Sequence, residues 1–148
     1  MKIGIATDHT GVNEKKVLIE YLTKKGYEVV DYSPVNDPAD DYPKFAHRVC
    51  KAITKKEVDL GILMCGTGIG MAIAANKHRG IRCALASSVE EAKLGRGHNN
   101  AQILAMSHKE DIDLLRAMAL AFIEEAFYGD ERHVRRLQEI EDYYEDER

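Results

Sequence analysis

The sequence has few cysteines and no secretory signal, which argues against a protein built on disulfides or on a zinc framework. Three cysteines stand among the 148 residues, and no two of them form a Cys-x-x-Cys pair. An odd number of thiols in this setting favours free thiols. Cys50, Cys65 and Cys83 therefore have to be interpreted one at a time.

A membrane protein and a nucleic-acid-binding protein are not expected either. No apolar run approaches the length needed to cross a bilayer, and residues 1–6 are typical of a strand rather than a signal peptide. The net charge of −4 gives no general attraction to nucleic acid or to an anionic membrane. We therefore expect a cytoplasmic protein, in which an anionic ligand needs a local cluster of donors.

What the sequence does contain is a regular alternation of short apolar runs and helical spacing. Its length suits one domain, which we expect to span residues 1–148. The apolar runs predict strands at residues 2–6, 28–31, 60–65, 82–86 and 103–105, each followed by a helix. The helix after the last strand is expected over residues 112–127. This pattern is typical of a three-layer α/β/α fold around a five-stranded parallel sheet. We expect the flavodoxin-like, Rossmann-like strand order 2-1-3-4-5.

In that order the first and third strands are neighbours, and ligands bind beyond their carboxyl ends. Asp8 and His9 follow the first strand, and residues 65–68 follow the third. The fold therefore predicts a ligand site at these residues. On local sequence alone, His9 could instead cap the turn that follows the strand.

Three glycines, Gly66, Gly68 and Gly70, lie between the third strand and a predicted helix at residues 71–76. They allow a tight bend that turns backbone N–H groups outward, and with the helix N-terminus these groups form a site for negative charge. By itself, such a loop could serve a dinucleotide, a phosphate or an enediolate.

Four familiar loop types do not fit. A P-loop needs Gly-Lys-Ser/Thr, and a dinucleotide fingerprint usually follows the first strand. A cysteine phosphatase needs an arginine where Met71 stands, and a phosphoacceptor domain needs an aspartate in place of Cys65. Cys65 therefore needs an explanation of its own.

A thiol with an ordinary pKa of about 8.5 is partly ionised at neutral pH, and a helix N-terminus lowers that value. Cys65 could thus be a nucleophile or a general base, or only a small buried hydrophobic residue. Cys50 and Cys83 lie in apolar stretches, which favours the buried interpretation for both.

Several motifs, taken together and in order, resemble the ribose-5-phosphate isomerase B family across nearly the whole chain. They are Asp8-His9, Asp41-Tyr42-Pro43, Cys65-Gly66-Thr67-Gly68-Ile69-Gly70, Ala74-Ala75-Asn76-Lys77, Gly80-Ile81-Arg82, Gly97-His98-Asn99-Asn100 and Arg132-His133-x-x-Arg136. The resemblance implies an aldose–ketose isomerase that uses neither a metal nor another cofactor. Its reaction would interconvert ribose 5-phosphate and ribulose 5-phosphate through an enediolate.

The resemblance also implies catalytic roles. Cys65 would be the base that moves a proton from C2 to C1, and Thr67 would help to move a proton between the two oxygens. His98 would open the furanose ring. The backbone N–H groups that would hold the enediolate belong to Gly66, Thr67, Gly68, Ile69 and Gly70. Some relatives lack the cysteine and place a glutamate where Met71 stands, so this chain is of the cysteine type.

For substrate binding, the resemblance assigns sugar hydroxyls to one group of side chains and the phosphate to another. The hydroxyls would be held by Asp8 and Asn99. The phosphate would be bound by His9, Arg132 and Arg136. Lys109 stands where an arginine is commoner in the family, which keeps the charge but loses the bidentate geometry.

Geometry suggests an assembly with shared sites. His98 and Asn99 precede the fifth strand and so lie away from the crevice of their own chain. Arg132 and Arg136, four residues apart, share one face of a predicted helix at about residues 132–144. We expect this helix to reach a partner subunit in a homodimer or a dimer of dimers. Without the resemblance, His98 could cap a helix end, and the arginines could form a solvated face.

Two other functions stay open from the sequence. The same chemistry could act on allose 6-phosphate, galactose 6-phosphate or a four-carbon sugar phosphate. Alternatively, the loop could belong to a non-catalytic module that binds a sugar phosphate or a nucleotide.

Overall fold

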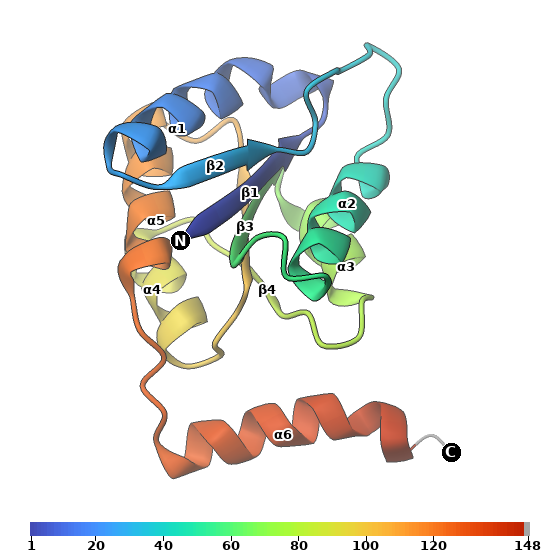
Figure 1. The fold of residues 1–148 in the computed structure, drawn as a ribbon, viewed down its shortest axis with the longest axis vertical. Coiled ribbons are helices and arrows are strands. Elements are labelled where there is room, and N and C mark those ends of the chain that lie inside the picture. Colours follow the sequence, from blue (N-terminus) through green and yellow to red (C-terminus); the bar gives the residue numbers. More distant parts are fainter. Residues whose placement is uncertain (147–148) are drawn as a thin grey trace.

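The computed structural model describes residues 1–146, which form a five-stranded parallel sheet between two layers of helices (Figure 1). The strands are β1 (Lys2–Thr7), β2 (Glu28–Asp31), β3 (Leu60–Cys65), β4 (Cys83–Leu85) and β5 (Ile103–Ser107). The helices are the short 3-10 helix η1 (His9–Gly11), α1 (Val12–Lys24), α2 (Pro43–Thr54), α3 (Ile69–Asn76), α4 (Val89–Gly97), α5 (Ile112–Glu124) and α6 (Glu131–Asp146). The predicted three-layer α/β fold is confirmed.

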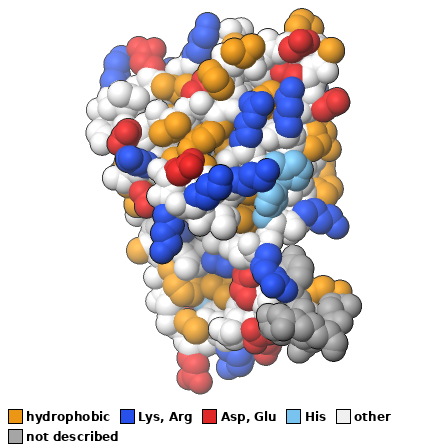
Figure 2. Space-filling view, turned by 45° about the vertical axis from the view of Figure 1, so that its right-hand side comes forward, with side chains coloured by type: hydrophobic (Ala, Val, Ile, Leu, Met, Phe, Trp, Pro, Cys, Tyr) orange, Lys and Arg blue, Asp and Glu red, His pale blue; other side chains and the backbone are white. Residues whose placement is uncertain are grey.

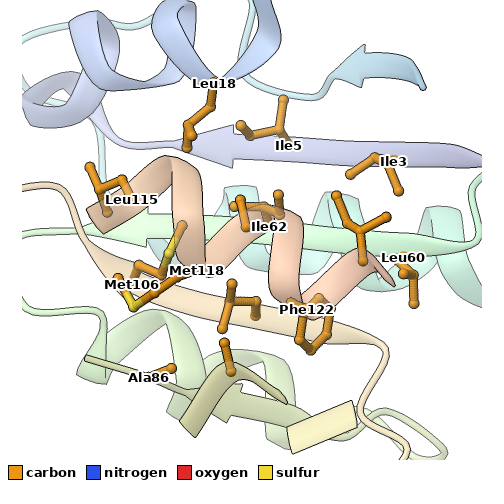
Figure 3. Close-up of a cluster of buried hydrophobic side chains, with 14 of the residues drawn as sticks. Ile3, Ile5, Leu18, Leu60, Ile62, Ala86, Met106, Leu115, Met118 and Phe122 are labelled. Carbon is orange, nitrogen blue, oxygen red and sulfur yellow. The ribbon is translucent and has the colours of Figure 1, made fainter. Parts of the chain in front are cut away.

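Each face of the sheet has its own apolar core. On one face, β1, β3 and β5 pack against α1, α4 and α5 through residues that include Ile62, Met106 and Phe122 (Figure 3). On the other face, Leu63 and Cys65 of β3 pack against α2 and α3. All six residues of β3 are buried, as expected for a central strand covered on both faces.

The strand order is 2-1-3-5-4, so the predicted order 2-1-3-4-5 is wrong for the last two strands. β5 is apolar and buried over Ile103–Met106, and it pairs with β3 on one side and with β4 on the other. β4 has three residues, of which Leu85 is exposed, and it takes the edge. An edge strand leaves the backbone hydrogen-bonding groups on one side unpaired. The interior position therefore stabilises the longer and more apolar β5 more than it would stabilise β4.

The C-terminal region also differs from the prediction. A single helix was expected over residues 112–127, but α5 ends at Glu124, and Glu125 is already extended with φ −76° and ψ 140°. An irregular segment then leads to α6, which lies apart from the layered body (Figure 1). α6 is tied back to the body by Arg82, whose Nη1 lies 2.6 Å from Oε1 of Glu141.

The face that carries α2 and α3 is rich in basic and histidine side chains, and α6 forms a separate part beneath it (Figure 2). On α2, His47 places its Nδ1 2.6 Å from Nε2 of His78. Over residues 1–146, no helix is both long enough and apolar enough to cross a membrane.

Candidate active site

Asp8 and His9 lie directly beyond the carboxyl end of β1, next to the end of β3. The parallel register pairs Thr7 with Met64, so Asp8 and Cys65 each follow a paired residue on neighbouring strands. Asp8 caps η1, because its Oδ1 accepts the backbone N–H of Thr10 at 3.1 Å. The strand order of this half of the sheet was predicted correctly, and the structure brings these three residues together.

The loop after β3 is held by hydrogen bonds to its own side chains. The Sγ atom of Cys65 accepts the backbone N–H of Gly68 at 3.2 Å, and Oγ1 of Thr67 accepts that of Ile69 at 3.2 Å. Gly68 has a φ of +79°, and a Cβ there would lie 2.9 Å from the carbonyl carbon of Met106. Glycine is therefore required at this position both by its conformation and by the available space.

The three thiols have different surroundings. Cys65 is 5% exposed at the edge of the α2–α3 core and accepts the N–H of Gly68. Burial raises the pKa of Cys50 to about 12, and burial likewise raises the pKa of Cys83. Both thiols are therefore neutral at physiological pH. Cys50 is fully buried, as the sequence analysis favoured, whereas Cys83 is only half-buried.

The end of β5 supports the glycine loop from the other side. Ser107 donates its hydroxyl to the carbonyl of Gly66 at 2.7 Å, and the backbone N–H of His108 donates to the carbonyl of Cys65 at 3.1 Å. Lys109 follows and is exposed, with its backbone N–H bound to Oγ of Ser107 at 3.1 Å. Lys109 thus lies at the same end of the sheet as Cys65 and His9, beyond the carboxyl ends of the strands.

His9 has a partner that the sequence analysis missed. Its Nδ1 lies 2.8 Å from Oδ1 of Asp40, and its backbone N–H donates to the same oxygen at 3.0 Å. The hydrogen bond to Asp40 is the main cause that raises the pKa of His9 above 6.5. Burial opposes ionisation of Asp40, but the hydrogen bonds from Asn36, His9 and Asp37 outweigh it and lower the pKa of Asp40 to about 2. The imidazole at this end of the sheet therefore stays protonated to a higher pH than a free histidine.

Four other predicted site residues lie at the opposite end of the sheet. Cys65 pairs with Ser107 and Gly61 pairs with Ile103, so the start of β5 is roughly 13 Å from its end at the usual rise per residue. His98 and Asn99 precede that start, and His98 caps the C-terminus of α4. Within one chain, the structure does not bring them to Cys65.

His98 is held by aromatic contacts. Its ring stacks on that of His133, with centroids 4.4 Å apart and planes 20° apart, and it meets the ring of Tyr128 edge-on at 5.4 Å. His133 belongs to α6, so the stack joins α4 to α6. No local sequence pattern predicts this pairing, because the residues are 35 positions apart.

The two arginines of α6 that were predicted to bind the phosphate are exposed to solvent. Arg136 is exposed, and the side chain of Arg132 is 62% exposed, with its Nε 3.4 Å from Oδ2 of Asp130. Asn99 is exposed as well. His98, Asn99, Arg132 and Arg136 thus form a second group, which we call the distal group. Among residues 1–146, no set of three His, Cys, Asp or Glu side chains is arranged to hold a metal ion.

Comparison with known proteins shows the family of this chain. Residues 3–140 match the model of the Ribose/Galactose Isomerase family. The chain belongs to this family. Ribose-5-phosphate isomerase B of Escherichia coli is 37% identical over 140 residues, which cover 94% of this chain and 93% of that protein.

Solved structures of the family share the whole fold. Ribose-5-phosphate isomerase B of Clostridium thermocellum superposes with a TM-score of 0.94 at 38% identity, and the match covers 100% of each chain. The ribose-5-phosphate isomerase B of Mycoplasma genitalium, solved with bound ribulose-5-phosphate, superposes with a TM-score of 0.92 at 40% identity. That match covers 98% of this chain and 97% of the other.

Proposed function

We propose that this member of the family is an aldose–ketose isomerase that interconverts ribose 5-phosphate and ribulose 5-phosphate. The observation that carries the proposal is the position of Cys65 at the end of β3, with its sulfur bound to the N–H of Gly68. A hydrogen bond donated to the sulfur stabilises negative charge on it, and the N-terminus of α3 adds to that effect. Family membership supplies the class of substrate.

In the proposed reaction, the Cys65 thiolate removes the proton from C2 of the open-chain aldose. The electron pair of the C–H bond forms the C1–C2 double bond, and the carbonyl oxygen at C1 takes up negative charge. Thr67 moves a proton between the two oxygens. Cys65 then returns its proton to C1, which yields the ketose and restores the thiolate.

The glycine loop stabilises the enediolate through backbone N–H groups. In the unliganded chain, the N–H of Gly68 is bound to Cys65 and that of Ile69 to Thr67. In the proposed reaction, the N–H of Gly68 exchanges its hydrogen-bond acceptor as the proton is transferred. It binds the sulfur at first and the negatively charged substrate oxygen afterwards. Donors aimed at developing charge are among the largest contributions to catalysis. Gly66 and Gly70 complete the loop.

Substrate binding needs both ends of the molecule, so we propose that the active enzyme is at least a homodimer. His9, Lys109 and Asp8 surround one side of the site. The distal group of a second chain would supply the other side: His98 for ring opening, Asn99 for a hydroxyl, and Arg132 and Arg136 for the phosphate. A two-fold axis between antiparallel subunits brings opposite ends of two chains together.

An apolar face beside the glycine loop supports this assembly. Ile69 and Ile73 of α3 are 51% and 58% exposed, and Leu85 on the edge strand β4 is 42% exposed. Ile69 and Ile73 are four residues apart and share one helix face. An exposed apolar face next to an unpaired strand is typical of a subunit interface.

An isomerase assay in deuterated water tests the function. We expect ribulose 5-phosphate to form from ribose 5-phosphate, with solvent deuterium appearing at the sugar carbon. A panel of five- and six-carbon aldose phosphates identifies the preferred sugar, and faster turnover of allose or galactose 6-phosphate would correct the substrate but keep the chemistry. Binding without deuterium exchange would leave only a non-catalytic binding module. The cytoplasmic location stays a prediction.

A further inference from the structure

We propose that Asp40 is a positioning residue for the substrate phosphate, because it fixes the ring of His9 through Nδ1 and leaves Nε2 as the N–H donor to the ligand. The proposal rests on the function proposed above, in which His9 binds the phosphate. Asp40 lies in the loop between β2 and α2, 31 residues from His9, and none of the motifs in the sequence analysis includes it.

The carboxylate of Asp40 has all of its contacts inside the protein. Its side chain is 1% exposed, whereas that of His9 is 38% exposed. Oδ1 accepts the Nδ1–H and the backbone N–H of His9, at 2.8 and 3.0 Å. Oδ2 accepts Nδ2 of Asn36 at 3.0 Å and the backbone N–H of Asp37 at 3.1 Å. Four donors therefore hold the carboxylate in one orientation.

The loop that carries Asp40 is fixed to the sheet. Asn36 donates its other amide hydrogen to the carbonyl of Thr7 at 3.1 Å, next to Asp8 and His9. Below it, the ammonium of the buried Lys15 donates to the carbonyl of Ser33 at 2.6 Å and lies 3.1 Å from Oδ2 of Asp31. The contact of Asn36 and the contacts of Lys15 restrain different parts of this loop. The loop can therefore hold the ring of His9 in one position.

Charge explains why a carboxylate can help to bind an anion here. Three acids act on His9: Asp40, Asp8 and Asp37. Asp40 is closest, and its charge is shared among four hydrogen bonds on the side away from solvent. With Nδ1–H bound to Asp40, the protonated imidazole carries its remaining N–H on Nε2. A phosphate thus meets a donor in a fixed direction, while the carboxylate stays behind the ring.

The test compares Asp40→Asn with Asp37→Asn, which removes the same charge from the same loop but no contact to the His9 ring. The His9 imidazole is followed by NMR titration, and inorganic phosphate is the binding probe. In Asp40→Asn, we expect the pKa of His9 to fall toward 6.5. The Kd for phosphate and the KM for ribose 5-phosphate should rise by roughly five- to tenfold at pH 7.5, with kcat changed less than about twofold. Asp37→Asn should have a clearly smaller effect on all three.

An unchanged His9 titration in Asp40→Asn would overturn the proposal, and so would a lowered pKa with unchanged phosphate affinity. If Asp40→Asn does not fold, the unmodified protein decides, because a His9 pKa at or below 6.5 contradicts the pairing. The titration and phosphate binding need no turnover. Failure of the unmodified protein to isomerise any sugar phosphate would therefore refute the proposed function separately.

Discussion

The Sγ atom of Cys65 accepts the backbone N–H of Gly68 at 3.2 Å, so the sulfur and the glycine loop form one hydrogen-bonded unit. The glycine that supplies this donor has a left-handed conformation and closely approaches Met106. Strand, loop and helix N-terminus therefore fix the direction of the donor before any ligand arrives. In the proposed reaction, this preorganisation reduces the rearrangement needed as charge moves from sulfur to substrate.

Replacing Gly68 by alanine should disturb this unit. The added Cβ would lie 2.8 Å from Cδ1 of Leu85 and 2.9 Å from the backbone of Met106, at a φ of +79°. We expect kcat to fall by roughly 10–100-fold, since small displacements of reacting groups have effects of this size. Activity and urea unfolding are measured together.

Gly26→Ala is the matched control for Gly68→Ala. Gly26 has a φ of +97° and no atom within 4 Å of an added Cβ. It should lose about 1–2 kcal/mol of unfolding free energy from the backbone conformation, with kcat unchanged. Equal kcat losses in the two variants would show that stability, and not loop geometry, limits turnover.

Cys65→Ala should abolish most of the isomerisation. Removing a general base lowers kcat by roughly 10²–10⁴-fold, while KM should stay within about threefold because the thiol is not needed for binding. Cys50→Ala serves as the control, because that thiol is fully buried and neutral. Retained turnover in Cys65→Ala would assign the base to another residue.

Arg136→Ala should raise KM strongly and change kcat little. The guanidinium is proposed to hold the phosphate in every state along the reaction, and removing such uniform binding acts on KM, by roughly tenfold or more. Arg135→Ala is the neighbouring control, since Arg135 is also exposed but points to another side of α6. If the arginines only form a solvated face of α6, KM should change equally little in Arg136→Ala and Arg135→Ala.

The His9–Asp40 pair should also give a characteristic dependence of stability on pH. The pKa of His9 is raised above 6.5, so its contribution is complete below 6.5 and is lost as pH rises through the raised value. The pKa of Asp40 is lowered from 3.8 to about 2, so its contribution is complete above 3.8 and is lost as pH falls toward 2. The unfolding free energy lost in Asp40→Asn should therefore be largest between these limits.

Urea unfolding of the unmodified protein and of Asp40→Asn, from below pH 3.8 to above pH 6.5, measures the difference in their unfolding free energies. A constant difference from low to high pH would mean that Asp40 stabilises the loop without being coupled to His9.

Most of the fold could be predicted because its signals are local. The run at 60–65 coincides with β3, since a buried parallel strand is apolar along its whole length, and the run at 28–31 coincides with the edge strand β2. The order of β4 and β5 depends on which strand is stabilised more by an interior position in the sheet. That is a property of the tertiary structure, and the spacing of apolar residues along the sequence does not reveal it. The end of α5 at Glu124 was missed because residues 125–127 continue the apolar pattern while adopting an extended path to α6.

The site was predictable to a similar degree. Asp8, His9 and Cys65 were expected together because they follow the ends of neighbouring strands. Asp40 was missed because its contact with His9 joins side chains far apart in sequence, although an acid-rich loop after the second strand was a usable signal. The stack of His98 on His133 was invisible for the same reason.

The most direct test mixes two inactive variants. Cys65→Ala and His98→Ala each lack one of the groups proposed to come from opposite ends of two chains. If they are refolded together, half of the dimers should contain one chain of each kind, and one of the two sites in such a dimer should be intact. We predict recovery of about a quarter of the activity of the unmodified enzyme. Activity no higher than that of the separate variants would contradict a shared site built around Cys65.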